Sequence, residues 1–107
     1  MAYRAQKTIE LIRHLAGEFL KGEKAGSALI TITDAKISDD YKEATVFFTV
    51  YPDNKEKAVL DFLKRKRSDF KHYVKEHATL GRIPFFDFAI DYGEKNRQKI
   101  DLISNNL

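Results

Sequence analysis

The chain has 107 residues, and its hydrophobic fraction of 43%, with eight Phe and five Tyr, is sufficient for the core of a single globular domain. It contains no cysteine, which excludes disulfides and thiolate metal ligands. The formal charge of +3 is a small basic excess, so only its distribution can indicate a polyanionic partner.

The first predicted element is an amphipathic helix over residues 6–20. Its apolar side chains recur at steps of three and four residues, which places them in one stripe: Ile9, Ile12, Leu15, Ala16, Phe19 and Leu20. Gly22 and Gly26 end this pattern, and the Gly, Lys and Ser content of residues 21–27 predicts an exposed loop.

Two strands follow the loop. Residues 28–37 are rich in β-branched side chains, and Glu43–Tyr51 alternates two sets of side chains between opposite faces. The Ser-Asp-Asp cluster at residues 38–40 suits a hairpin turn, and Pro52 ends the second strand.

A helical pattern begins after Pro52. Asp53, followed three residues later by Glu56, has the spacing of a capping box and predicts the helix start. The inner stripe is predicted to contain Ala58, Val59, Phe62 and Leu63, and to resume at Phe70, Tyr73 and Val74.

Between these two parts of the stripe, the core-facing turn holds Lys66 and Arg67. Such side chains are almost never fully buried without partners. We therefore predict a break near residues 67–69, with Ser68 or Asp69 capping a second helix that ends at about His77. The break would turn the cations toward solvent.

Residues 83–92 predict a third strand. Its pattern places Phe86, Phe88, Ile90 and Tyr92 on one face and Asp87 and Asp91 on the other. The tail from Gly93 has a short apolar set at Ile100, Leu102 and Ile103, which leaves a marginal helix and a mobile segment as open alternatives.

The predicted order is α-β-β-α-α-β with a short C-terminal extension. Such a chain buries its helices on one face of a three-stranded sheet, which gives a two-layer α+β domain. We assign residues 1–92 to this domain and residues 93–107 to the extension.

The sequence offers no constellation for catalysis. It has no catalytic Cys, nucleophile elbow or phosphate-binding glycine loop, so we expect no enzyme, no cofactor and no small-molecule substrate, and a small hydrolase has no support. His72 and His77 are five residues apart and cannot share a helix face, and His14 is distant, so we expect no metal site.

Targeting signals are also absent from the pattern. The N-terminal segment carries acidic residues and lacks the apolar core of a signal peptide, and no later stretch approaches the ~18 apolar residues of a membrane span. We therefore expect a cytoplasmic protein with no membrane partner.

The basic excess is concentrated at the predicted break. Residues 62–75 contain six cations and one acid, a local charge of +5: Lys64, Arg65, Lys66, Arg67, Lys71 and Lys75 against Asp69. We call Lys64, Arg65, Lys66 and Arg67 the basic corner. Such a cluster is stabilised when a polyanion neutralises it.

A solvated helix face is the alternative explanation for these charges. The predicted turn, the bidentate capacity of Arg and the hydroxyl of Ser68 favour phosphate binding instead. We therefore predict RNA binding by the basic corner with Ser68, Lys71 and Lys75, and peripheral contacts from a second set: Arg82, Lys95 and Arg97.

Three aromatic residues, Phe47, Tyr51 and Phe85, could lie on the sheet face away from the helices and stack on bases. The interpretation we favour is that the N-terminal helix or the tail covers them, or that they are edge aromatics. A protein-interaction module that docks through a sheet edge or the apolar tail remains the alternative to RNA binding.

Several segments resemble the bacterial ribosome-binding factor A family. They are TITDAKIS, EATVFFTVY and IPFFDFAIDYGEKNRQKI, and the similarity extends from Arg4 to about Leu102. The resemblance implies a type II K-homology topology and a non-enzymatic monomer that binds 16S rRNA of the small ribosomal subunit. It also implies a role in late subunit maturation, in 5′-end processing of 16S rRNA and in growth in the cold.

One element departs from the family pattern. Where the family has a short Ala-x-Gly element in an interrupted helix, this chain has Arg67, Ser68 and Asp69. The missing Gly removes the easy route to a positive φ, and Asp69 brings a negative charge to the presumed phosphate path. Asp69 acting as a helix cap would reconcile the two.

Overall fold

The computed structural model describes residues 2–21 and 28–105, with the side chains of residues 5–21 and 28–100. The predicted loop after the first helix falls largely on residues 22–27, outside this range. The elements are α1 (Ala2–Lys21), β1 (Leu29–Ile37), β2 (Glu43–Tyr51), a 3-10 turn η1 (Asp53–Lys55), α2 (Glu56–Arg65), α3 (Arg67–His77), β3 (Phe85–Ile90) and α4 (Tyr92–Asn105).

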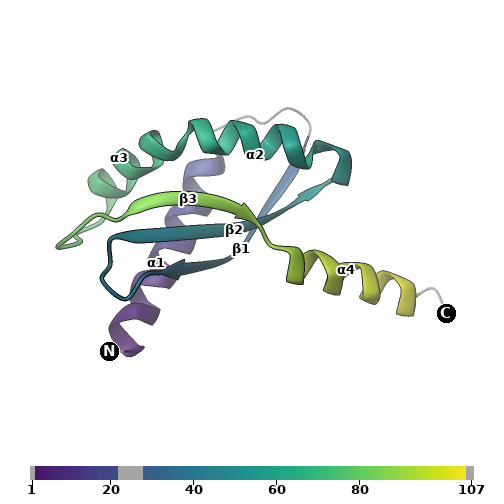
Figure 1. Cartoon of the computed structure of the whole chain (residues 1–107), viewed down its shortest axis with the longest axis horizontal. Coiled ribbons are helices and arrows are strands. Elements are labelled where there is room, and N and C mark those ends of the chain that lie inside the picture. Colours follow the sequence, from purple (N-terminus) through teal and green to yellow (C-terminus); the bar gives the residue numbers. More distant parts are fainter. Residues whose placement is uncertain (1, 22–27, 106–107) are drawn as a thin grey trace.

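The sheet has the order β1-β2-β3, with β1 antiparallel and β3 parallel to the central strand β2. One residue of β1, Thr33, is skipped in the pairing and forms a bulge. Helix α1 packs on β1, and α2 and α3 pack on β3, all on the same face of the sheet (Figure 1). The prediction of a two-layer α+β domain is therefore confirmed.

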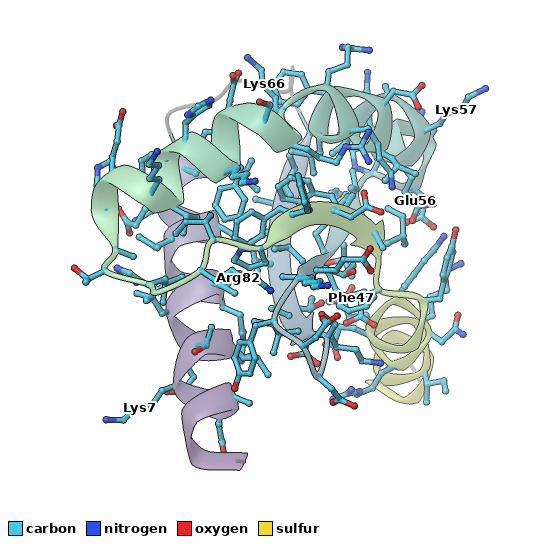
Figure 2. The ribbon with its side chains drawn as sticks, turned by 60° about the vertical axis from the view of Figure 1, so that its left-hand side comes forward. Lys7, Phe47, Glu56, Lys57, Lys66 and Arg82 are labelled. Carbon is cyan, nitrogen blue, oxygen red and sulfur yellow. The ribbon has the colours of Figure 1, made fainter. Side chains whose placement is uncertain are left out.

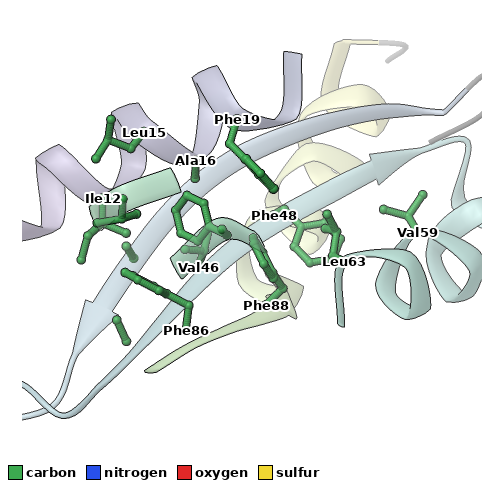
Figure 3. Close-up of a cluster of buried hydrophobic side chains, with 14 of the residues drawn as sticks. Ile12, Leu15, Ala16, Phe19, Val46, Phe48, Val59, Leu63, Phe86 and Phe88 are labelled. Carbon is green, nitrogen blue, oxygen red and sulfur yellow. The ribbon is translucent and has the colours of Figure 1, made fainter. Parts of the chain in front are cut away.

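The core lies between this sheet face and the three helices (Figure 3). The alternation predicted for β2 is confirmed, since one set of its side chains is buried: Ala44, Val46, Phe48 and Val50. Phe86 and Phe88 of β3 continue the same layer, and Ile12, Leu15 and Ala16 close it from α1. The helix stripe and the strand alternation thus meet in one core.

Some predicted boundaries differ from the structure. Helix α1 begins at Ala2, four residues before the predicted start, and β1 begins at Leu29. The third strand is shorter than predicted because Pro84 has no N–H to donate, so the ladder starts where Phe85 N–H donates to Lys42 O at 2.9 Å. Tyr92, expected on the buried face, is exposed and begins α4.

The capping box predicted at the start of the second helix is wrong. Asp53 begins a 3-10 turn, the N-cap of α2 is Lys55, and no side chain caps the helix. The carboxylates of Asp53 and Glu56 contact Lys95 of α4 instead, at 3.9 and 2.9 Å. Ala58, assigned to the inner stripe, is exposed, whereas Val59 and Leu63 are buried.

The tail is helical, which decides between the two alternatives left open. Asp91 forms the start of α4, because its Oδ1 accepts from Glu94 N–H at 3.0 Å and its Oδ2 accepts from the Thr33 hydroxyl at 2.5 Å. Figure 1 shows α4 extending away from the sheet, at the opposite end of the molecule from α3. Ile100 is exposed, and the side chains of Leu102 and Ile103 lie outside the described residues.

Candidate nucleic-acid interface

The predicted break between the two helices is present, at Lys66. This residue has φ −97° and ψ 4°; its N–H donates to Leu63 O at 3.0 Å, and its own carbonyl accepts from Phe70 N–H at 2.9 Å. It ends α2 and is also the N-cap of α3, so the prediction that Ser68 or Asp69 caps the second helix is wrong. The end of α3 at His77 is confirmed.

The bend forms without the glycine of the family pattern. Lys66 has a negative φ, and the only positive φ of a non-glycine residue in the part of the chain that the structure describes is at Tyr41. Asp69 lies in the first turn of α3, where a negative charge is favoured by the helix dipole, and its carboxylate is 3.7 Å from Lys66 Nζ. Asp69 therefore supports the start of α3 by its charge rather than by capping.

Two fully buried side chains fix the geometry of the bend. Leu63 before it and Phe70 after it have no exposed surface. The Phe70 ring lies edge-on against Phe86 of β3, with ring centroids 4.7 Å apart, and also contacts Phe19 of α1 at 5.3 Å. Because both flanks are anchored in the core, the residues between them are placed on the outer side, as Figure 2 shows for Lys66.

The four residues of the basic corner differ in their partners. Lys64 Nζ is 2.5 Å from Asp87 Oδ1, and Arg67 NH1 is 3.5 Å from the same oxygen. Arg67 Nε also donates to Lys64 O at 2.9 Å. Arg65 is exposed and forms no ion pair with the residues that the structure describes. Lys66 Nζ is 3.7 Å from Asp69 Oδ2. The corner thus combines three cations that have an acidic partner within the protein, Lys64, Lys66 and Arg67, with one that faces solvent, Arg65.

Asp87 is the member of this cluster that the sequence did not predict, because it contacts the cations from a different element. It lies on β3, and its Oδ1 also accepts from Phe88 N–H at 2.9 Å. Partial burial acts to raise the pKa of Asp87, but the hydrogen bond from Lys64, that from Phe88 N–H and the charges of Lys64 and Arg67 lower it below its ordinary value of 3.8. Its carboxylate is therefore ionised at neutral pH.

The remaining predicted residues of this region follow α3 away from the corner. Ser68 and Lys75 are exposed, and Lys71 Nζ lies 3.9 Å from the ring centroid of Phe85. Since residues four apart share a helix face, Arg67, Lys71 and Lys75 form one basic stripe. The structure thus brings the predicted main set of cations together along α2 and α3.

The peripheral candidates are not part of this surface. Lys95 bridges Glu56 and Asp53, and the hydrogen bond to Glu56 raises the pKa of the Lys95 amine. Arg97 pairs with Glu94 at 3.0 Å. Both lie on α4, at the far end of the molecule in Figure 1. Arg82 lies in the segment before β3, where it lines a small pocket with Thr8 and Tyr41 (Figure 2).

Of the two explanations favoured for the sheet aromatics, coverage by a helix is wrong for Tyr51 and Phe85, whereas an edge position fits Phe85. Tyr51 is 72% exposed and Phe85 is 69% exposed, so neither α1 nor α4 covers them. Phe47 is half-buried, with Lys36 Nζ 5.6 Å from its ring centroid. Tyr51 lies at the end of β2 and Phe85 at the start of the edge strand β3, so the two are exposed aromatics at strand ends.

Two features of the described residues bear on other functions. No cluster of three or more His, Asp or Glu side chains there could bind a metal ion. Within the same residues, none of the helices combines the length and the apolar character needed to cross a bilayer.

Relatives of the chain are found by both sequence and structure. Residues 4–104 match the family model for ribosome-binding factor A. Ribosome-binding factor A from Coxiella burnetii (strain Dugway 5J108-111) is 30% identical over 105 residues, which cover 96% of this chain and 88% of the relative. The protein of the same name from Streptomyces coelicolor is 34% identical over 93 residues, which cover 82% of this chain and 58% of the relative.

Solved structures share the fold. The crystal structure of ribosome-binding factor A from Thermus thermophilus matches with a TM-score of 0.73 at 15% identity, covering 80% of this chain and 93% of that one. The solution structure of a Thermotoga maritima protein described as a putative ribosome binding factor A matches with a TM-score of 0.69 at 22% identity. The match covers 83% of this chain and 88% of that one. The fold is thus the type II K-homology-like fold of these proteins.

The family model spans nearly the whole described chain, including the interrupted helix pair and the three strands. The chain therefore belongs to the ribosome-binding factor A family.

Proposed function

We propose that this protein binds 16S rRNA of the small ribosomal subunit through the basic corner and the stripe of Lys71 and Lys75 on α3. The observation that carries the proposal is the break at Lys66. It places the cations on the outer side of the helix pair, while Leu63 and Phe70 remain in the core. Membership of the ribosome-binding factor A family supports a ribosomal partner. Ser68, in the first turn of α3, adds a hydroxyl and free backbone N–H groups for phosphate.

The proposal includes the biological setting that the family resemblance implies. The protein acts in the cytoplasm as a monomeric, non-enzymatic assembly factor in late subunit maturation and 5′-end processing of 16S rRNA, and it supports growth in the cold. Residues 1–92 form the RNA-binding domain and residues 93–107 a C-terminal extension. Phosphate contacts of this kind position a protein on RNA without reading its sequence.

Charge reversal at the two solvent-facing cations tests the proposal. Arg65→Glu with Lys75→Glu leaves the contacts of Asp87 intact, so the fold and the rest of the site are preserved. We expect this variant to lose co-sedimentation with purified small ribosomal subunits while its circular dichroism spectrum stays unchanged.

A matched control comes from other parts of the surface. Arg13→Glu with Lys57→Glu makes the same change of charge at exposed residues of α1 and of the far end of α2 (Figure 2 shows Lys57). This control is expected to co-sediment like the unmodified protein. Equal retention, or equal loss, of binding by the two double variants would refute the assignment of the site.

A protein-interaction module remains the second candidate, because exposed apolar side chains gather away from the basic corner. Leu29 and Tyr51 line a groove of about 430 Å³ between the sheet and α4, and Lys95 and Lys99 form its other wall. RNA binding weakens steeply as salt is raised, whereas docking on an apolar groove does not. Co-sedimentation that persists at high salt would favour this second function.

A further inference from the structure

The oxygen Asp87 Oδ1 accepts three contacts of the kind that a phosphate oxygen accepts. Lys64 Nζ lies at 2.5 Å, Phe88 N–H donates at 2.9 Å, and Arg67 NH1 lies at 3.5 Å. Lys and Arg side chains together with a backbone N–H are the usual donors to a phosphate. The carboxylate therefore occupies a position where two cations of the basic corner converge.

The three elements that meet here fix this convergence. Lys64 comes from the last turn of α2, Arg67 from the first turn of α3, and Asp87 from the adjacent strand β3. Arg67 is held further by its bond to Lys64 O at 2.9 Å. The two cations are thus held at the edge of β3 before any ligand arrives.

The ion pairs of Lys64 and Arg67 with Asp87 are close to solvent, so a phosphate can replace the carboxylate. The side chains of Lys64, Arg67 and Asp87 are 37%, 49% and 45% exposed. Ion pairs with this exposure contribute little to stability, so replacing one anion by another has a small energetic cost. A phosphate group can reach the cations from solvent without opening the core.

We propose that Lys64 and Arg67 form a phosphate-binding subsite of the basic corner, and that Asp87 is its built-in competitor, which RNA must displace. This inference rests on the proposed RNA-binding function and adds a residue that sets its affinity. Asp87 neutralises about one positive charge of the corner. RNA binding to the unmodified protein therefore gains about one fewer phosphate contact than binding to a protein without this carboxylate. Ligands that present several phosphates compensate for this loss, whereas a single anion does not.

The test is Asp87→Asn, which keeps an oxygen to accept from Phe88 N–H and removes the charge. For a labelled single-stranded oligouridylate, one extra phosphate contact steepens the plot of log affinity against log salt by about 0.7. The gain in affinity over the unmodified protein should therefore grow about two- to threefold between about 200 and about 50 mM salt. Fluorescence anisotropy measures both quantities.

Two controls separate release of the subsite from a general change in charge. Glu10→Gln makes the same charge change on the exposed surface of α1 and is expected to leave the slope unchanged. Asp87→Asn placed in a Lys64→Gln, Arg67→Gln background should give no gain, because the cations that it releases are missing. A gain that persists in that background would overturn the proposal.

The outcomes also distinguish this inference from the proposed function. Unchanged or weaker oligouridylate binding by a folded Asp87→Asn variant overturns the competitor role, even when Arg65→Glu with Lys75→Glu still abolishes binding. If the Arg65→Glu, Lys75→Glu double variant binds as tightly as the unmodified protein, the proposed site itself is refuted. Circular dichroism and a urea midpoint within the range of the unmodified protein show that the Asp87→Asn variant is folded.

Discussion

The residue that anchors the proposed RNA-binding surface to the core is Phe70, and its removal gives the sharpest prediction about the fold. Phe70 follows the break by four residues, has no exposed surface and contacts three rings: Phe19 at 5.3 Å, Phe86 at 4.7 Å and Phe88 at 5.7 Å. Phe70→Ala leaves a cavity between α3, α1 and β3. No charge of the basic corner changes.

The expected cost follows from this environment. Truncation of a buried Phe to Ala costs about 3 to 5 kcal/mol, and the loss of three ring contacts places Phe70 toward the upper part of that range. The free energy of unfolding of such domains is about 5 to 15 kcal/mol, so the variant loses about a quarter or more of its stability. Its oligouridylate affinity should fall in parallel, since α3 is no longer fixed on the sheet.

Urea unfolding followed by far-ultraviolet circular dichroism measures this loss. The matched control is Phe85→Ala, because Phe85 is 69% exposed and its main contact is the cation–π pair with Lys71. The control should cost less than about 1 kcal/mol. If Phe70→Ala also cost less than about 1 kcal/mol, Phe70 would not anchor the bend and the reasoning would be refuted.

Two further predictions concern acidic residues. The pKa of Asp91 is lowered chiefly by the hydrogen bond from Thr33 and then by that from Glu94 N–H. The ionised carboxylate therefore stabilises the fold fully above the ordinary pKa of 3.8, and this stabilisation is lost as pH falls through the lowered pKa. Asp91→Asn should therefore make the urea midpoint fall less steeply on acidification, and an unchanged acid profile would contradict this. Asp69→Gly, which restores the glycine of the family pattern, should destabilise the protein by about 1 to 2 kcal/mol, because Gly is a poor helix former and the favourable charge in the first turn of α3 is lost. The same variant should bind oligouridylate more tightly, and a urea midpoint equal to that of the unmodified protein would show that Asp69 does not support α3.

The parts of the fold that depend on local periodicity could be predicted from the sequence. Strand Glu43–Tyr51 has the predicted bounds, since its side chains divide between two faces up to Pro52, with Ala44, Val46, Phe48 and Val50 on the core side. The break in the helix was predicted because cations cannot replace core residues, but its position at Lys66 depends on how Leu63 and Phe70 pack. Packing of this kind is not encoded in spacing alone.

The errors come from contacts between distant segments. Asp53 and Glu56 have capping-box spacing, but Lys95, about forty residues later, provides a stronger partner for both carboxylates. The pairing of Asp87 with Lys64 and Arg67 likewise joins residues on different elements, about twenty positions apart in the sequence. Only the parallel placement of β3 beside β2, under α2, brings these groups together.

The most direct test of RNA binding at the basic corner uses the absence of cysteine from the chain. A Ser68→Cys variant carries a tethered iron chelate at the start of α3, and a Glu10→Cys variant carries the same group on the exposed side of α1. Each is bound to purified small ribosomal subunits, and hydroxyl-radical cleavage of 16S rRNA is mapped. We predict strong cleavage from position 68 and little from position 10. Co-sedimentation of the Ser68→Cys variant without any cleavage of 16S rRNA would contradict the account.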